Sequence, residues 1–206
     1  MSRVAIMGSG SWGTAFSMVL ADAGSQVTIW TRDEEVANQV NGLHRNESYH
    51  PGIDLPESVA ATTDPALALD GADLVVLAVP AQVLRENLAV WAAKIPGNSV
   101  LVSLIKGIEL ETMKRMSEVI AEVTGAASHR VACVSGPNLA REIAEHQPTA
   151  TTIACDLESS ARLLADACTT DYFRPYWTTD VVGTEIGGAV KNVIALANGM
   201  AVGMGL

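Results

Sequence analysis

The stretch VAIMGSGSWGTAFSMVLADA, residues 4–23, decides the fold. It begins as a short apolar strand and ends as a helix, and between them lies the pattern G-x-G-x-x-G. In this context the pattern predicts a dinucleotide-binding turn. Gly8 permits the tight turn, Gly10 lets the backbone approach a pyrophosphate, and Gly13 allows the helix to pack closely on the strand. The start of the helix adds N–H groups and partial positive charge for the same anion. A turn that binds no ligand is the alternative.

The rest of the chain alternates short apolar runs with longer helical patterns, which is typical of an α/β protein with a mainly parallel sheet. We therefore predict a doubly wound, Rossmann-like dinucleotide-binding domain over residues 1–182. The predicted strands are Arg3–Met7, Gln26–Thr31, Leu74–Ala78, Ser99–Leu104, Ala132–Ser135, Thr151–Ala154 and Tyr172–Trp177. The predicted helices are Gly13–Ala23, Asp33–Val40, Asp64–Leu69, Gln82–Lys94, Thr112–Thr124, Asn138–Glu145, Leu157–Ala167 and Val182 onward. The stretch Asn41–Pro56 shows no period and is predicted to be a long surface loop.

Composition excludes several classes of function. With 23 acidic and 13 basic residues the net charge is −10, which argues against a nucleic-acid partner or an anionic membrane surface. The first residues form too short an apolar run for a signal peptide, so we expect a cytoplasmic protein. The cysteines are predicted to be buried free thiols in a reducing compartment: Cys133, Cys155 and Cys168. The histidines lack ligand spacing, so no metal site is expected: His44, His50, His129 and His146.

The C-terminal stretch Thr184–Leu206 reads as a helix of small residues that is apolar nearly all round, and we expect it to be buried on every side. Lys191 and Asn192 within it argue against membrane insertion. Two explanations remain for what buries it. It packs against a partner subunit in a homodimer, or residues 183–206 are the first helix of a helical substrate domain whose remaining part these 206 residues do not contain. The second explanation is favoured.

The end of the second predicted strand bears on the choice of cofactor. An acidic residue there would bind the ribose 2′-hydroxyl of NAD, but Thr31 occupies the position and Arg32 follows. Because an arginine can pair with a 2′-phosphate, NADP is accommodated. Asp33, one residue further, could still take the hydroxyl, so the cofactor is predicted to be NADP or NAD. A solvated arginine that opens a helix is the alternative for Arg32.

Two lysines stand out among the few cations. Lys106 follows an apolar strand and precedes Gly107, which places it at the carboxyl edge of the sheet, where doubly wound folds bind ligands. Lys191 is the sole cation of the last helix. Its small apolar neighbours would reduce the hydration of the amine, which lowers the pKa of the amine toward the range useful for proton transfer. A lysine that extends from an apolar helix to water is the alternative.

Five motifs in this order resemble those of the bacterial type of NAD(P)-dependent glycerol-3-phosphate dehydrogenase. They are GSGSWGTA at 8–15, TIWTR at 28–32, SLIKGIE at 103–109, SGPNLAREI at 135–143 and GTEIGGAVKNVIALANG at 183–199. The resemblance implies an oxidoreductase that interconverts dihydroxyacetone phosphate and sn-glycerol 3-phosphate for phospholipid biosynthesis. It implies cofactor contacts by Gly8, Gly10, Ser11, Trp12, Gly13, Arg32, Lys106 and Ala140. It implies substrate contacts by Lys106, Gly136, Asn138, Lys191 and Asn192, with Lys191 as the proton-transfer residue.

The family also has a second, helical domain that carries an acid near the catalytic lysine and an arginine for the substrate phosphate. We expect the 206 residues to be the front part of a longer protein, in which cofactor binding survives and turnover is low or absent. One alternative is another β-hydroxyacid-type dehydrogenase or ketopantoate reductase. Those enzymes separate the catalytic lysine and asparagine by intervening residues, whereas Lys191 and Asn192 are adjacent here. The other is a dinucleotide-binding module without catalysis.

Overall fold

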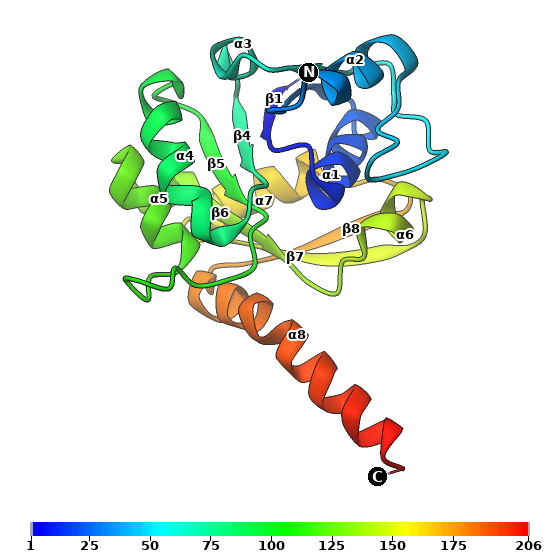
Figure 1. Ribbon diagram of the computed structural model, residues 1–206. Helices are drawn as coiled ribbons and strands as arrows, with labels where there is room; N and C mark the ends of the chain where they lie inside the picture. Colours follow the sequence, from blue (N-terminus) through cyan, green and yellow to red (C-terminus); the bar gives the residue numbers. More distant parts are fainter. Residues whose placement is uncertain (1, 206) are drawn as a thin grey trace.

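Eight strands form one sheet in the order β3-β2-β1-β4-β5-β6-β7-β8 (Figure 1). The computed structural model of the chain describes residues 2–205. Neighbouring strands are parallel except β6 and β7, which are antiparallel. The chain leaves β1 for β2 on one side and later returns to β4 on the other, which makes the carboxyl ends of β1 and β4 a topological switch point. The strands are β1 (Arg3–Met7), β2 (Gln26–Trp30), β3 (Val59–Thr62), β4 (Leu74–Leu77), β5 (Val100–Ser103), β6 (Val131–Ser135), β7 (Thr149–Cys155) and β8 (Phe173–Thr178).

The predicted doubly wound fold is confirmed, and most elements lie within a few residues of their predicted bounds. The strand β3 is a correction, because the sequence analysis assigned no strand there. The predicted helix Thr112–Thr124 is also shorter, since it begins at Met116. The helices are α1 (Ser11–Asp22), α2 (Glu34–Leu43), α3 (Pro65–Leu69), α4 (Leu84–Trp91), α5 (Met116–Thr124), α6 (Ala140–Ala144), α7 (Glu158–Ala167) and α8 (Val181–Gly203).

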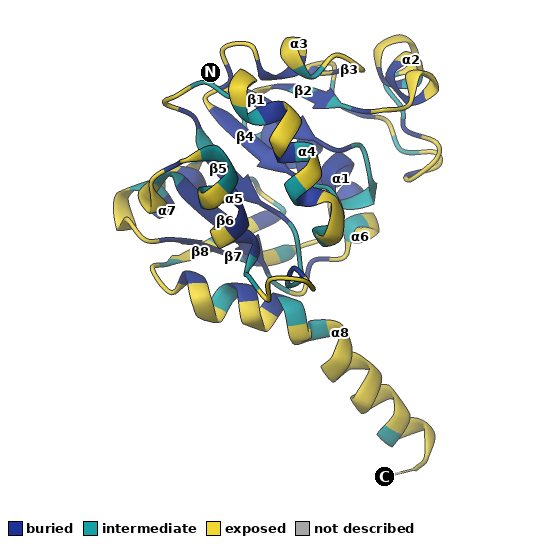
Figure 2. Cartoon of the chain, turned by 60° about the vertical axis from the view of Figure 1, so that its left-hand side comes forward, coloured by how far each residue is buried: buried dark blue, intermediate teal, exposed yellow. Residues whose placement is uncertain are grey.

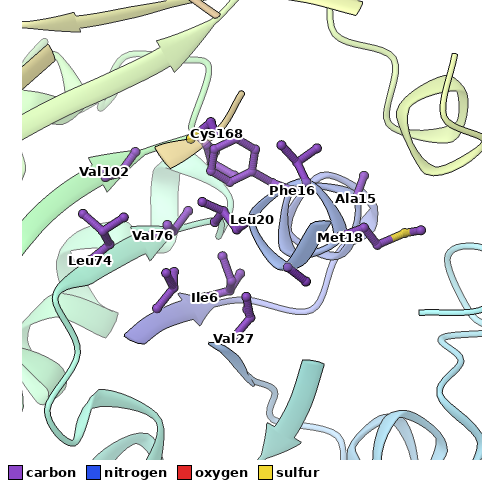
Figure 3. Close-up of a cluster of buried hydrophobic side chains, with 14 of the residues drawn as sticks. Ile6, Ala15, Phe16, Met18, Leu20, Val27, Leu74, Val76, Val102 and Cys168 are labelled. Carbon is purple, nitrogen blue, oxygen red and sulfur yellow. The ribbon is translucent and has the colours of Figure 1, made fainter. Parts of the chain in front are cut away.

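The central strands are buried on both faces, which explains their unbroken apolar runs. Along β1, Val4 and Ile6 face one core cluster while Ala5 and Met7 face the other. The first cluster lies between the sheet and α1 and includes Ile6, Phe16 and Val76 (Figure 3). The second lies under α3, α4 and α5. The three cysteines are buried, and all are free thiols in the part of the chain that the structure describes.

The helix α8 contradicts the expectation of burial on every side. Its first half packs on β6 and β7 and buries Val181, Glu185 and Gly188. Its second half extends away from the sheet with its apolar side chains exposed, and Val193 is 65% exposed (Figure 2). In Figures 1 and 2 no other element of residues 2–205 lies beside that half. By length and mean hydropathy alone, α8 also meets the criterion for a membrane span, as the core helices of soluble proteins often do.

Candidate active site

A cavity of about 790 Å³ lies at the carboxyl ends of the central strands, at the switch point between β1 and β4. Its walls come from the glycine-rich turn after β1, the ends of β2, β4 and β5, the start of α6, and α8. The sequence-predicted site residues that line it are Gly8, Gly10, Ser11, Trp12, Gly13, Arg32, Lys106, Asn138, Ala140, Lys191 and Asn192. Gly136 borders a second cavity of about 610 Å³ beside α8. Lys191 lines both cavities, so the two meet at its side chain.

The three glycines of the turn have different surroundings. Gly8 has a φ of 132°, and a Cβ there would lie 2.5 Å from the Ala78 carbonyl oxygen. A Cβ on Gly13 would lie 2.3 Å from the Gly8 carbonyl oxygen, so both positions need glycine for packing. A Cβ on Gly10 would meet no atom within 4 Å among the described residues. Gly10 is therefore free for close approach by a ligand.

The start of α1 is suited to an anion. Gly10 is the N-cap, and among residues 2–205 no side chain caps this helix. The first N–H groups of a helix lack partners within the helix and carry its positive dipole end. They face a cavity that the glycine-rich turn borders. A pyrophosphate would satisfy these donors, so the residues present fit the diphosphate of a dinucleotide.

The end of β2 distinguishes between the two possible cofactor contacts. The hydroxyl of Thr31 is engaged, since it accepts hydrogen bonds from Ser9 Oγ at 2.8 Å and from the Asp33 backbone N–H at 3.2 Å. The carboxylate of Asp33 accepts a hydrogen bond from the Glu35 N–H at 2.9 Å and caps α2. Arg32 is exposed, and in the described part of the chain it forms no ion pair. Arg32 is thus an unpaired cation at the end of β2, and the exposed Asp33 carboxylate keeps its second oxygen for a ribose hydroxyl.

Lys106 is held at the floor of the cavity. It follows β5, and its Nζ donates a hydrogen bond to the Gly136 carbonyl oxygen at 3.1 Å. Burial lowers the pKa of the Lys106 amine, and the positive charge of Lys191 lowers it further. Both lysines line the one cavity, although they come from segments far apart in sequence. An anionic substrate between them would relieve their mutual repulsion.

Lys191 lines the cavity and is partly exposed, so it is less buried than its small apolar neighbours in the sequence suggest. Its helix comes close to the sheet because of Gly188, where a Cβ would lie 2.5 Å from Ser135 Oγ and 3.5 Å from Lys106 Cγ. Asn192 is exposed beside Lys191. Sequence reasoning gave Gly188 no role. Gly188 stands in a run of small residues, and that pattern does not indicate which of them allows α8 to approach the sheet closely.

A buried carboxylate fixes the position of α8. Glu185 accepts hydrogen bonds from the Ser117 N–H at 2.8 Å, from Ser117 Oγ at 2.6 Å and from Arg115 Nη1 at 2.7 Å. These partners lie at the start of α5, where a negative charge is favourable. Glu185 precedes Lys191 by six residues on the same helix, so this anchor sets where the lysine stands.

The loop that carries Lys106 is tied to α4 and to the turn before it. The Gln82 side chain donates to the Ile108 carbonyl oxygen at 2.9 Å and accepts from the Leu110 N–H at 3.1 Å. Arg85 donates from two nitrogens to the Glu109 carboxylate, each at 2.9 Å. This pairing, together with a hydrogen bond from Thr112, lowers the pKa of Glu109 to about 2. The ion pair therefore persists over the whole physiological pH range.

Asn138 lines the cavity, but both ends of its amide are engaged with β7. It donates to the Ala150 carbonyl oxygen at 3.2 Å and accepts from Thr151 Oγ1 at 3.1 Å. The histidines and acidic residues of the described chain form no metal-ligand cluster. The loop predicted as surface is only partly so, because its Asn46 and His50 are fully buried against the glycine-rich turn.

Comparisons with known proteins identify relatives of this chain. The family described as NAD-dependent glycerol-3-phosphate dehydrogenase N-terminus matches residues 3–161, and the corresponding C-terminus family matches residues 180–206. A Glycerol-3-phosphate dehydrogenase [NAD(P)+] of Corynebacterium diphtheriae is 60% identical over 204 residues, and one of Streptomyces griseus is 59% identical. These matches cover 99% of the chain but only 62% and 61% of the relatives, so the chain spans about three fifths of their length.

Solved structures give the same result. The glycerol-3-phosphate dehydrogenase of Coxiella burnetii has a TM-score of 0.89 at 30% identity, over 98% of this chain and 61% of that one. The enzyme of Saccharomyces cerevisiae also has a TM-score of 0.89, at 28% identity, over 99% of this chain and 64% of that one. A ketopantoate reductase of Ralstonia eutropha reaches 0.61 at 20% identity, over 87% of this chain and 57% of that one, which shows a shared fold alone.

Proposed function

The chain belongs to the NAD-dependent glycerol-3-phosphate dehydrogenase family, and we propose that it is the dinucleotide-binding part of an enzyme that reduces dihydroxyacetone phosphate to sn-glycerol 3-phosphate reversibly. The observation that supports this most is one cavity bordered by an uncapped helix start, a free arginine and two lysines. In this proposal residues 1–182 bind the dinucleotide, and residues 183–206 begin the substrate domain. The product would enter glycerophospholipid synthesis. In this proposal the protein acts in the cytoplasm, binds no nucleic acid and does not insert into a membrane.

The cofactor contacts follow from the groups that border the cavity. The N–H groups at the start of α1 bind the diphosphate, with Gly10 allowing close approach and Ser11 and Trp12 beside it. Arg32 pairs with the 2′-phosphate of NADP. When bound, NAD(P)H supplies the hydride for the ketone carbon of the substrate. Ala140, at the start of α6, forms part of the opposite wall.

Lys191 donates the proton that the ketone oxygen needs during reduction, and takes it back in the reverse direction. Lys106 holds the phosphorylated substrate as a localised cation, steadied by its hydrogen bond to the Gly136 carbonyl. Gly136 and Asn138 allow the substrate to approach the backbone after β6. Asn192 completes the polar wall beside Lys191.

Replacing Arg32 by Ala is expected to weaken NADPH binding by about tenfold to a hundredfold, because a charge-assisted pair with phosphate is lost. Binding of NADH should change less than about twofold, because it has no 2′-phosphate. Isothermal titration of both cofactors against wild type and variant measures this. An equal loss for NADH and NADPH would contradict the contact with the 2′-phosphate.

The proposed reaction is tested in a chimera that joins these 206 residues to the C-terminal remainder of the Corynebacterium diphtheriae relative. Oxidation of NADPH should depend on dihydroxyacetone phosphate. It should be at least about a hundredfold slower with ketopantoate, because ketopantoate has no phosphate group to contact the site. The 206-residue chain should bind NADPH by itself. Failure of the folded chain to bind either NADPH or NADH would overturn the proposed function.

A further inference from the structure

The loop between α2 and β3 is closed by hydrogen bonds between its own ends and lies beside α1 (Figure 1). We call residues 44–55 the strap loop. Its ends meet, because the Leu55 N–H donates to the His44 carbonyl at 2.7 Å and Arg45 Nε donates to Asp54 Oδ1 at 2.7 Å. Loops of this length with joined ends behave as compact units. The strap loop therefore has a defined shape of its own.

Two strap-loop side chains are fully buried against the glycine-rich turn. Asn46 Nδ2 donates to the Ser9 carbonyl oxygen at 3.0 Å and to Thr14 Oγ1 at 2.9 Å. His50 Nε2 lies 2.8 Å from the Ser11 carbonyl oxygen. Since a carbonyl oxygen only accepts, Nε2 carries the proton of this hydrogen bond. The strap loop thus holds the Ser9 carbonyl of the turn and the Ser11 carbonyl at the first residue of α1.

Holding a carbonyl also fixes the N–H group of the same peptide unit. Peptide units are planar and trans, so their C=O and N–H groups point in opposite directions. The Ser9 carbonyl shares its unit with the Gly10 N–H, and the Ser11 carbonyl shares its unit with the Trp12 N–H. Both N–H groups are consequently directed away from the Asn46 and His50 side chains that bind these carbonyls. Gly10 and Trp12 both line the large cavity.

We propose that Asn46 and His50 are positioning residues that preset the N–H groups of the glycine-rich turn for the diphosphate of the dinucleotide. This inference rests on the proposed function. A turn rich in glycine has many accessible conformations, and ordering them on binding weakens affinity. The hydrogen bonds from Asn46 and His50 restrict the conformation of the turn before the cofactor binds. The two residues touch the turn from behind and do not themselves contact the cofactor.

Calorimetric titration of the 206-residue chain with NADPH tests this proposal. Asn46→Ala and His50→Leu should each raise the Kd about tenfold, as expected when one charge-assisted contact loses its geometry. His50→Gln keeps a donor near the Nε2 position and should bind within about twofold of wild type. If Asn46→Ala does not fold, the pair His50→Leu and His50→Gln decides.

The matched control is Asn41→Ala. Like Asn46, Asn41 makes two hydrogen bonds through its side-chain amide, in this case both to the Ala61 backbone at 2.8 Å, but it lies on α2 and bonds no residue of the turn. Its loss should lower the Tm without changing the Kd of NADPH. Adenosine 2′-phosphate, which lacks the diphosphate, supplies a second readout. Its Kd should be the same in Asn46→Ala, His50→Leu and wild type.

The outcomes separate the two proposals. Binding of NADPH by wild type with unchanged Kd in His50→Leu would overturn the role of the strap loop and leave the proposed function standing. Equal weakening of NADPH and adenosine 2′-phosphate would also overturn it, because that pattern indicates a general disturbance of the cavity. Absence of NADPH binding in the folded wild type would instead overturn the proposed function.

Discussion

Replacing Lys191 by Met is expected to lower kcat for ketone reduction by about a hundredfold to ten-thousandfold, the usual contribution of a positioned general acid. The variant keeps a long side chain at the mouth of the site but has no proton to donate. Binding of NADPH should stay within about twofold, since the diphosphate contacts lie at the other end of the cavity. Stopped-flow measurement of NADPH oxidation in the chimera gives kcat, and titration gives the Kd.

Two controls make this result specific to proton transfer. Lys106→Met should raise the KM for the substrate more than it lowers kcat, because that amine holds the substrate. In Lys191→Ala, added methylamine should restore part of the rate, because a small amine can occupy the vacated space and donate the proton. A kcat for Lys191→Met within about tenfold of wild type would contradict the role of this lysine.

The second large effect is expected from alanine substitutions at Gly10 and Gly13, which differ in what surrounds them. Gly10→Ala should change the free energy of unfolding by no more than about 1 kcal/mol, because a Cβ there meets open space. It should weaken NADPH binding by about a hundredfold or more, because the methyl group occupies the path of the diphosphate and disturbs several charged hydrogen bonds.

Gly13→Ala should show the opposite balance. The added Cβ would overlap the Gly8 carbonyl oxygen, so α1 must shift, and we expect a loss of about 2–3 kcal/mol in the free energy of unfolding. Urea unfolding followed by circular dichroism, combined with NADPH titration, measures both quantities. Tight NADPH binding by Gly10→Ala would contradict the placement of the diphosphate.

The sequence was enough to predict the alternating fold and the glycine-rich turn, because both depend on local patterns, whereas most other residues of the cavity wall were expected only from the family resemblance. Strands buried on both faces leave apolar runs such as Leu74–Leu77, and the turn after β1 has its own glycine spacing. The strand β3 was missed since its sequence, Val-Ala-Ala-Thr, is short and weakly apolar. The burial of α8 was wrongly predicted, because composition shows that a surface is apolar but not whether the chain covers it.

The supports of the site could not be predicted, because each joins polar residues distant in sequence. Arg115 and Glu185 are 70 residues apart, and Arg85 and Glu109 are 24 apart. Before folding, such residues are indistinguishable from solvated surface charges. Asn46 and His50 stand in a stretch without periodicity, where the default expectation is an exposed loop. Their burial follows from the strap loop as a whole.

A crystal structure of the chain with NADPH tests the central claim most directly. We expect the diphosphate against the N–H groups at the start of α1, the 2′-phosphate beside Arg32, and the nicotinamide end directed toward Lys106 and Lys191. Density for the nucleotide at any other surface, or a reversed orientation with the nicotinamide at Arg32, would contradict the account.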